Sequence, residues 1–223
     1  MSGKLYVTGV PIGNFDDISY RAAEILKKVD MICAEDPRVT VKLLKHLGIE
    51  KRCVLYADFL RCGDGESPAE CLLRGGECAL VSDAGMPVIA DPGFDFVSFC
   101  RQNGISVLSV PGPCAAMAAL SVCGLNVSRF TFEGFLTVNK PNRVRHLNEI
   151  KDEKRAIVFY EAAKKLPATL FDLYSVLGDR RCAIVKEITK PAENCELSTL
   201  KDASEKYAGA RLKGEYVLVI EAL

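Results

Sequence analysis

The chain has 223 residues, of which 49% are hydrophobic and 26% charged, a composition typical of a globular protein with room for one large or two small domains. Basic and acidic residues number 29 each, so the formal net charge is zero and no global field attracts nucleic acid or acidic membranes. No apolar run approaches the roughly 20 residues of a membrane span, and the N-terminus lacks a signal-peptide pattern. We therefore expect a cytoplasmic protein.

The chain contains ten cysteines and two histidines, which are the ligands that a zinc site would use. No two cysteines form a C-x-x-C pair, and several lie inside apolar runs such as MICAED (31–36) and ECALVS (77–82). Thiols in such runs pack as small hydrophobes. We therefore expect reduced, structural cysteines and no bound metal.

Short apolar runs alternate with amphipathic segments through the first half of the chain. The runs predict strands at 5–10, 31–36, 53–56, 77–82 and 105–110. The segments between them predict helices at 16–30, 39–48, 67–76 and 91–104. Five strands separated by helices indicate an α/β domain with a mostly parallel sheet covered on both faces.

The segment VPGPC (110–114) is a stiff hinge, because proline fixes its own φ and restricts the residue before it. We place the boundary between an N-terminal domain, 1–112, and a C-terminal domain, 113–223, at this hinge. Further strands are predicted at 130–135, 155–161, 181–189 and 215–222. Further helices are predicted at 114–124, 142–151, 163–177 and 198–208, so the second domain is also α/β.

Glycine, proline and acidic residues gather in the loops that follow four of the first five strands. These loops are TGVPIGN (8–14), AEDPRVT (34–40), SDAGMPVIADPG (82–93) and PGPCAA (111–116). Ligands of an open parallel sheet bind beyond the carboxyl ends of its strands, which is where these loops begin. No phosphate-binding G-x-x-x-x-G-K-[ST] or G-x-G-x-x-G motif is present, so a nucleoside ligand without phosphates, such as S-adenosylmethionine, fits best. The alternatives are that Asp83 only closes an Asx-turn and that Asp36 and Arg38 form only a local ion pair.

These motifs and others downstream resemble the tetrapyrrole methylase superfamily and, within it, the ribosomal RNA small subunit methyltransferase I group. The matching motifs are VPIGN (10–14), AEDPR (34–38), SDAGMPVIADPG (82–93), PGPCAA (111–116), FEGF (132–135), FYE (159–161), EITK (187–190) and KGE (213–215). The resemblance implies a homodimeric class III methyltransferase of two α/β domains, with S-adenosylmethionine in the cleft between them. Its acceptor would be the 2′-hydroxyl of a cytidine ribose in the decoding region of small-subunit (16S) rRNA.

The resemblance also implies which residues face the cofactor. They are Ile12, Asp83, Ala84, Met86, Cys114, Ala115, Tyr160, Ile188 and Gly214. For proton transfer from the acceptor hydroxyl, the candidates at strand ends are Asp36, Glu161, Glu187 and Lys190, with no base assigned among them. Alternatively, Glu161 and Glu187 pair with Lys186, Lys190 or Arg181 as scaffold. His46 and His146 lie on basic stretches and are expected to be solvated.

RNA binding requires cations, because contacts to phosphates supply most sequence-independent affinity. The basic cluster KPNRVRH (140–146) and the residues after FYE provide the candidates Lys140, Arg143, Arg145, Lys164 and Lys165. The alternative is that these charges only solvate a helix face.

Two other functions remain open on sequence grounds. One is methylation of a corrin or porphyrin precursor by the same fold. The other is a non-catalytic, ribosome-associated module that binds a nucleoside. Pro37 and Met86 stand where the resembling group usually has threonine, and that group's His-Asn-Glu element after the third strand is absent, which favours the second alternative.

Overall fold

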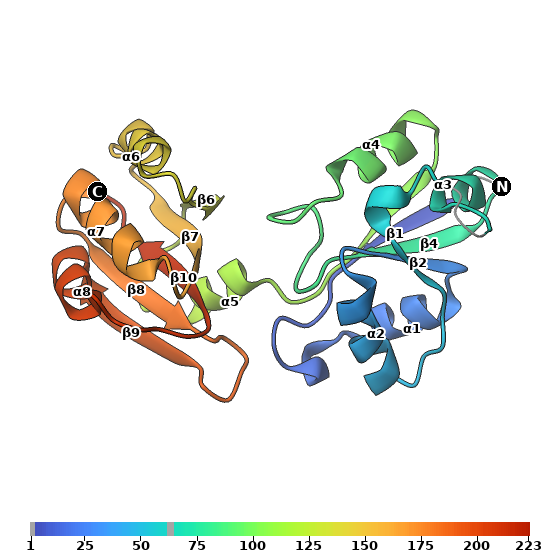
Figure 1. Ribbon diagram of the computed structural model, residues 1–223, viewed down its shortest axis with the longest axis horizontal. Helices are drawn as coiled ribbons and strands as arrows, with labels where there is room; N and C mark the ends of the chain where they lie inside the picture. The colour runs from blue at the N-terminus through green and yellow to red at the C-terminus, as the bar shows by residue number, and fades with distance from the viewer. Residues whose placement is uncertain (1–2, 62–64) are drawn as a thin grey trace. The chain divides into compact units, whose positions relative to one another are not determined.

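This computed structural model describes residues 3–61 and 65–223 of the chain (Figure 1). These residues contain ten β-strands and eight α-helices. These elements divide into two compact units, Met1–Cys114 and Ala115–Leu223. The boundary lies two residues beyond the expected one, at the end of the proline-rich hinge.

The first unit is built on a five-stranded sheet in which all neighbouring strands are parallel. Its order is β3-β2-β4-β1-β5, formed by β1 (Lys4–Thr8), β2 (Met31–Ala34), β3 (Cys53–Leu55), β4 (Glu77–Val81) and β5 (Ser106–Val110). The helices are α1 (Tyr20–Lys28), α2 (Pro37–His46), α3 (Pro68–Leu73) and α4 (Phe94–Gln102). The expected parallel α/β sheet is confirmed.

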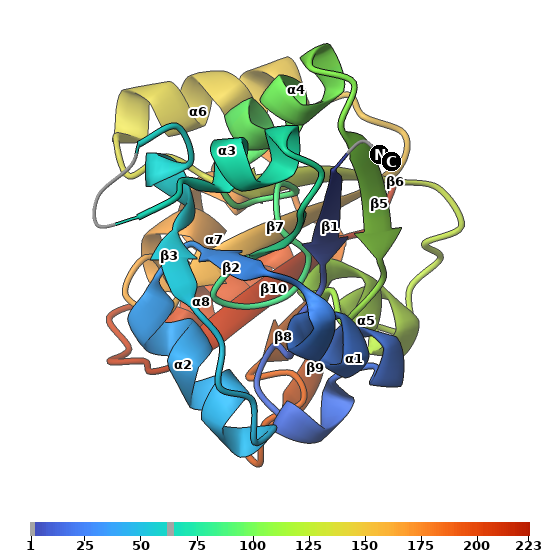
Figure 2. The same cartoon turned by 90° about the vertical axis from the view of Figure 1, so that its right-hand side faces the viewer.

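Side chains alternate between the two faces of this sheet, as the period of two in a strand requires. Tyr6 and Ile32 pack beneath α1 and α2, whereas the adjacent Leu5 and Met31 pack beneath α3 and α4. Figure 2 shows these two helix pairs on opposite faces of the sheet. The carboxyl ends of the strands therefore emerge together at one edge, with both faces already covered.

Local capping residues decide where the helices begin. Ser67 and Glu70 form the predicted capping box of α3, each side chain accepting from the backbone N–H of the other. The helix predicted over 16–30 starts only at Tyr20, because Ser19 caps it by accepting from the backbone of Ala22. A short 3₁₀ turn, Phe15–Asp17, precedes it.

The second unit contains a mixed five-stranded sheet in the order β6-β7-β10-β8-β9. Its strands are β6 (Phe130–Phe135), β7 (Ala156–Ala162), β8 (Arg181–Lys186), β9 (Asn194–Thr199) and β10 (Glu215–Ile220). Its helices are α5 (Ala115–Val122), α6 (Lys140–Glu149), α7 (Leu166–Leu177) and α8 (Leu200–Tyr207). Only β6 and β7 pair in parallel; the other pairs are antiparallel.

A single core joins one face of this sheet to three helices. Leu147 of α6, Leu170 of α7 and Leu200 of α8 are fully buried in it, against Phe159 and Leu218 of the sheet. The helix α5 contacts β7 and β10.

The strand β9 was not predicted, because no element was expected between the strand at 181–189 and the helix at 198–208. Its sequence, NCELST, contains one β-branched residue, Thr199, and no aromatic residue, so it gives little indication of a strand. It lies at the edge of the sheet and pairs only with β8, so it needs no apolar alternation to be held there.

Eight cysteines of the described residues, all except Cys114, are free thiols, and Cys62 lies outside those residues. Most are buried, as expected for thiols that pack in apolar surroundings. Within the described ranges, no helix is both long and apolar enough to span a bilayer.

Candidate functional site

Three loops at the carboxyl edge of the first sheet are fastened to one another through their backbones. Val10 and Gly85 form a reciprocal antiparallel bridge, with N–H to O distances of 2.9 and 3.1 Å. Gly9 lies so close to Gly112 that a Cβ on Gly112 would be 2.7 Å from the carbonyl carbon of Gly9. Only glycine permits this approach, so the loops after β1, β4 and β5 form one rigid surface.

Two residues expected to face the cofactor lie on this surface. A Cβ on Gly85, whose φ is +79°, would meet Cγ2 of Ile12 at 3.4 Å. A Cβ on Gly9 would meet Sδ of Met86 at 2.6 Å. Ile12 and Met86 are therefore held against the glycine backbones of neighbouring loops, although they lie far apart in the first unit's sequence.

Acidic residues connect the loops after β2 and β4. The backbone N–H of Asp36 donates to Oδ1 of Asp83 at 3.1 Å, and the N–H of Asp83 donates to Oε2 of Glu35 at 3.2 Å. Asp83 therefore fastens a neighbouring loop through its carboxylate. Asp36 caps α2 and forms the local ion pair with Arg38 that the sequence left as an alternative, with an N to O distance of 2.7 Å. The hydrogen bonds from Arg38 lower the pKa of Asp36 to about 2.

Asp91 is an acid at this edge that the sequence analysis did not single out. Partial burial raises its pKa to about 6, and the nearby charges of Glu35 and Asp83 act in the same direction. A hydrogen bond with Ser82 opposes them. The only sequence signal was its position as the second aspartate of SDAGMPVIADPG, which does not reveal that three carboxylates approach one another.

In the second unit, Tyr160 connects β7 to the start of α5. Its hydroxyl accepts from the backbone N–H of Ala116 at 3.0 Å, one residue after Ala115, where α5 begins. The ring packs edge-on against Phe132 and Phe135, with centroids 4.9 and 5.4 Å apart. The candidate cofactor residues Ala115 and Tyr160 are therefore neighbours, and Cys114, which is half-buried, directly precedes them in the chain.

The turn EITK (187–190) is strained and packs against the segment KGE (213–215). Glu187 and Thr189 adopt φ values of +50° and +67°, a region that L residues rarely occupy. Glu187 accepts from the ammonium of Lys190 at 3.0 Å and from the backbone N–H of Glu215 at 2.9 Å. A Cβ on Gly214 would lie 2.7 Å from the Glu187 carboxyl carbon. Such strain collects at functional turns.

Lys190 is also committed to carboxylates, since its ammonium lies 2.7 Å from the Glu215 carboxylate as well. Its pairing with Glu187 agrees with the scaffold alternative. Ile188 lies between the two strained residues and is 9% exposed. The candidates Glu187, Ile188, Lys190 and Gly214 thus form one cluster.

Glu161 is the most enclosed of the four candidate proton acceptors, with 2% exposure. It accepts from the Thr169 hydroxyl at 2.5 Å, the Lys165 ammonium at 2.9 Å and the Ala162 N–H at 2.8 Å. Its partners differ from the three basic residues proposed for the scaffold alternative. Lys165 also donates to the carbonyl of Leu136 at 3.1 Å, so its charge is used internally.

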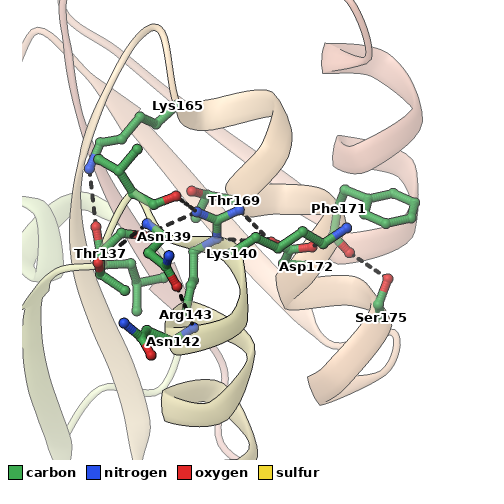
Figure 3. A network of polar contacts seen from close by, with 12 residues as sticks. Thr137, Asn139, Lys140, Asn142, Arg143, Lys165, Thr169, Phe171, Asp172 and Ser175 are labelled. Carbon is green, nitrogen blue, oxygen red and sulfur yellow. Dashed lines mark hydrogen bonds and ion pairs between the residues drawn. The ribbon is translucent and has the colours of Figure 1, made fainter.

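The predicted RNA contact of Arg143 is wrong, because its guanidinium is buried between α6 and α7 (Figure 3). Two of its nitrogens donate to Oδ2 of Asp172 at 2.8 and 2.6 Å. The third donates to the carbonyls of Thr137 and Val138, both at 3.1 Å. These contacts use four of its five N–H groups, and only 7% of the side chain is exposed, so Arg143 is not available to a phosphate.

The other basic candidates divide by exposure. Lys140, Arg145 and Lys164 are exposed, as RNA contacts require. His146 is 32% exposed and contacts Glu133 at 3.0 Å, so it is only partly solvated. His46 is exposed and packs its ring against Phe15.

The comparisons with known proteins agree on one family. The family of Tetrapyrrole (Corrin/Porphyrin) Methylases matches residues 4–204. A relative from Thermotoga maritima is 40% identical over 218 residues, covering 98% of both chains. One from Halalkalibacterium halodurans is 41% identical over 219 residues, covering 98% of this chain and 76% of its own. Both relatives are named Ribosomal RNA small subunit methyltransferase I.

Solved structures share the fold at much lower identity. A uroporphyrin-III-C-methyltransferase from Thermus thermophilus superposes with a TM-score of 0.68 at 20% identity, covering 98% of this chain and 94% of its own. A putative diphthine synthase from Entamoeba histolytica also gives a TM-score of 0.68, at 16% identity, covering 99% and 93%. These likenesses support the two-unit α/β architecture and do not identify an acceptor.

Replacing Arg143 with alanine should destabilise the protein by about 3 to 5 kcal/mol, because the Asp172 carboxylate would remain buried without its main partner. Arg145→Ala is the matched control: it lies two residues away on α6, is exposed, and should change stability by less than about 0.5 kcal/mol. Urea denaturation followed by circular dichroism measures both. Equal, small effects would contradict a structural role for Arg143.

The raised pKa of Asp91 predicts a pH-dependent stability. The folded state binds the proton of Asp91 more tightly than the unfolded state does. The resulting gain in the free energy of unfolding is therefore complete below about pH 4 and is lost as pH rises through about 6. Asp91→Asn should therefore raise the free energy of unfolding at about pH 7.5 by about 1 kcal/mol, since solvent screens this half-buried group, and leave it unchanged at about pH 3.5. Denaturation at the two pH values tests this. An unchanged or reduced stability at the higher pH would contradict the raised pKa.

Proposed function

The chain belongs to the tetrapyrrole (corrin/porphyrin) methylase family and, within it, to the ribosomal RNA small subunit methyltransferase I group. From this membership we propose that it transfers the methyl group of S-adenosylmethionine to the 2′-hydroxyl of a cytidine in the decoding region of small-subunit (16S) rRNA.

The similarity to the Thermotoga maritima relative carries this proposal, because it extends over 98% of both chains at 40% identity. The alternative acceptors, corrin and porphyrin precursors, have weaker support. The uroporphyrin methyltransferase that shares the fold is only 20% identical to this chain. Identity at that level indicates the fold without the acceptor.

The rigid loops of the first unit suit a nucleoside. Gly9, Gly85 and Gly112 bring main-chain groups to the surface, and the Asp83 carboxylate beside them can accept from ribose hydroxyls. The residues proposed to hold the cofactor are Ile12, Asp83, Ala84, Met86 and Cys114 of the first unit and Ala115, Tyr160, Ile188 and Gly214 of the second. The bound cofactor would supply a methyl group activated by its sulfonium charge.

The four candidate proton acceptors support catalysis by positioning. Asp36 is paired with Arg38 and has a pKa of about 2, which makes it a weak base. Glu161 is enclosed by hydrogen-bond donors. Glu187 and Lys190 neutralise each other. We therefore propose that these side chains hold the loops that orient the acceptor hydroxyl, and that orientation and desolvation supply most of the rate.

Three cations support RNA binding. Lys140, Arg145 and Lys164 are exposed on the second unit, where phosphates can reach them. Because the proposed substrate is ribosomal RNA, the proposal includes action in the cytoplasm. The homodimer that the resemblance implies stays a prediction.

The proposal predicts methyl transfer to small ribosomal subunits isolated from cells that lack this gene. Labelled S-adenosylmethionine should give 2′-O-methylcytidine in small-subunit rRNA, identified by nucleoside mass spectrometry. Subunits from cells that carry the gene are the control and should accept almost none. Methylation of another nucleoside would contradict the proposed acceptor, and no transfer despite cofactor binding would favour a small-molecule acceptor or a non-catalytic module.

Catalysis by positioning predicts modest effects when the candidate acceptors are removed. Asp36→Ala, Glu187→Ala and Lys190→Ala should each lower kcat by less than about tenfold, because a general base contributes roughly 10²- to 10⁴-fold. Single-turnover methyl transfer measures this, with cofactor binding and circular dichroism as controls for folding. A folded, cofactor-binding variant that loses about a hundredfold or more would instead identify its residue as the base.

A further inference from the structure

The segment 135–140, which runs from the end of β6 to the start of α6, is held by two internal cations. The ammonium of Lys165 binds the carbonyl of Leu136, and the guanidinium of Arg143 binds the next two carbonyls along the chain. Asn139 completes the arrangement by capping α6 through the N–H of Asn142 at 3.1 Å. Three consecutive carbonyls are thus fixed, which is unusual for an exposed connection.

Each cation is itself anchored by a buried carboxylate. Lys165 is paired with Glu161, which is 2% exposed, and Arg143 with Asp172, which is 3% exposed. Figure 3 shows Lys165 and Arg143 approaching the segment from different elements. Because both ion pairs are largely removed from water, they restrict the segment far more than surface pairs would.

This rigid segment presents apolar side chains to solvent. Phe135 is 56% exposed and Val138 is 75% exposed. On the adjacent helix α7, Phe171 is 55% exposed, and Figure 3 shows its ring directed away from Arg143. None of these side chains belongs to the core of the second unit, and the edge-on contact with Tyr160 leaves more than half of Phe135 in solvent.

A lysine accompanies each exposed ring. The ammonium of Lys165 lies 5.8 Å from the ring centroid of Phe135, and that of Lys140 lies 5.7 Å from the centroid of Phe171. Lys140, the first residue of α6, is 65% exposed and lies 3.8 Å from Oδ1 of Asp172, whose other oxygen binds Arg143 at 2.6 Å, so two cations share one carboxylate. Exposed flat rings beside the exposed ammonium of Lys140 suit a ligand that combines planar π faces with negative charge.

We propose that Phe135 and Phe171 stack against unpaired bases of the RNA substrate, while Lys140, Arg145 and Lys164 contact its phosphates. The inference rests on the proposed function and adds to it the form of RNA that this surface takes. Bases within a duplex are stacked on each other and offer no free face, so the surface selects single-stranded RNA. The held segment reduces the entropy lost on binding, because its backbone is already ordered.

The test replaces each ring and measures the KM of methyl transfer to small ribosomal subunits. Phe171→Ala should raise KM by about tenfold with kcat nearly unchanged, the loss expected for one stacked base, and Phe171→Tyr should restore it. Phe135→Ala should act in the same direction. Tyr20→Ala is the control, because Tyr20 is 95% exposed at the start of α1 in the first unit and should leave KM unchanged.

A binding experiment separates single strands from other partners. A fluorescent single-stranded RNA oligonucleotide should bind Phe171→Ala about tenfold more weakly than the unaltered protein, whereas a duplex of the same sequence should bind both equally. Cofactor binding, measured by calorimetry, should be the same for the two proteins. Equal weakening for strand and duplex would overturn stacking in favour of a general backbone contact.

The outcomes distinguish this inference from the function on which it rests. If the unaltered protein methylates small subunits and Phe171→Ala has an unchanged KM, the stacking surface is wrong and the proposed function stands. If the unaltered protein neither methylates nor binds RNA, both are wrong. Binding of a protein rather than RNA at the rings of Phe135 and Phe171 would also overturn the inference.

Discussion

The backbone of Gly9 can lie against that of Gly112 only because β1 and β5 are parallel neighbours whose carboxyl ends reach the same edge of the sheet. The order β3-β2-β4-β1-β5 then brings the ends of β2 and β4 to the same edge. Loops separated by up to a hundred residues in the chain become adjacent, and the glycines let them touch through main-chain atoms. The Met86 side chain lies against Gly9 at this contact, and Asp83 is held by the loop after β2.

In the second unit, ion pairs rather than glycine contacts hold the loops in place. Its sheet is mixed, so strand ends do not all meet at one edge. The segment after β6 is instead fixed by Lys165 and Arg143, whose own positions depend on Glu161 and Asp172. The turn at Glu187 is likewise fixed through Lys190, and the strain of its positive φ is maintained by these ion pairs.

Much of the fold was predictable, because hydrophobic period and turn chemistry carry most of the information about buried strands and capped helices. The parallel sheet, the capping box at Ser67 and the boundary near the proline-rich hinge follow from patterns within a few residues. The edge strand β9 was missed because its conformation depends on pairing with β8 rather than on its own sequence. An edge strand needs one partner and little apolar surface, so its own sequence, NCELST, is ambiguous.

For the candidate site, the positions of the loops were predictable, but the partners of the charged side chains were not. Loop motifs located Ile12, Asp83 and Met86 at one edge, because parallel strands make that edge obvious from the order of elements. The partner of a charged side chain depends on segments far away, and no local pattern reveals it. Asp172 lies 29 residues after Arg143 and had no role in the prediction, yet it converts the central arginine of KPNRVRH into a structural residue.

Burial therefore determines which charges of a neutral chain can act on a ligand. Of five basic residues chosen from the sequence, Arg143 and Lys165 are consumed by internal carboxylates and carbonyls. Their pairing also neutralises Glu161 and Asp172, two acids that would otherwise weaken the positive potential around Lys140, Arg145 and Lys164. A chain with no net charge can thus present a local cationic surface, because Glu161 and Asp172, the two acids beside these cations, are buried and paired. The same pairs fix the backbone that exposes Phe135 and Val138, so charge and shape at this surface have one structural cause.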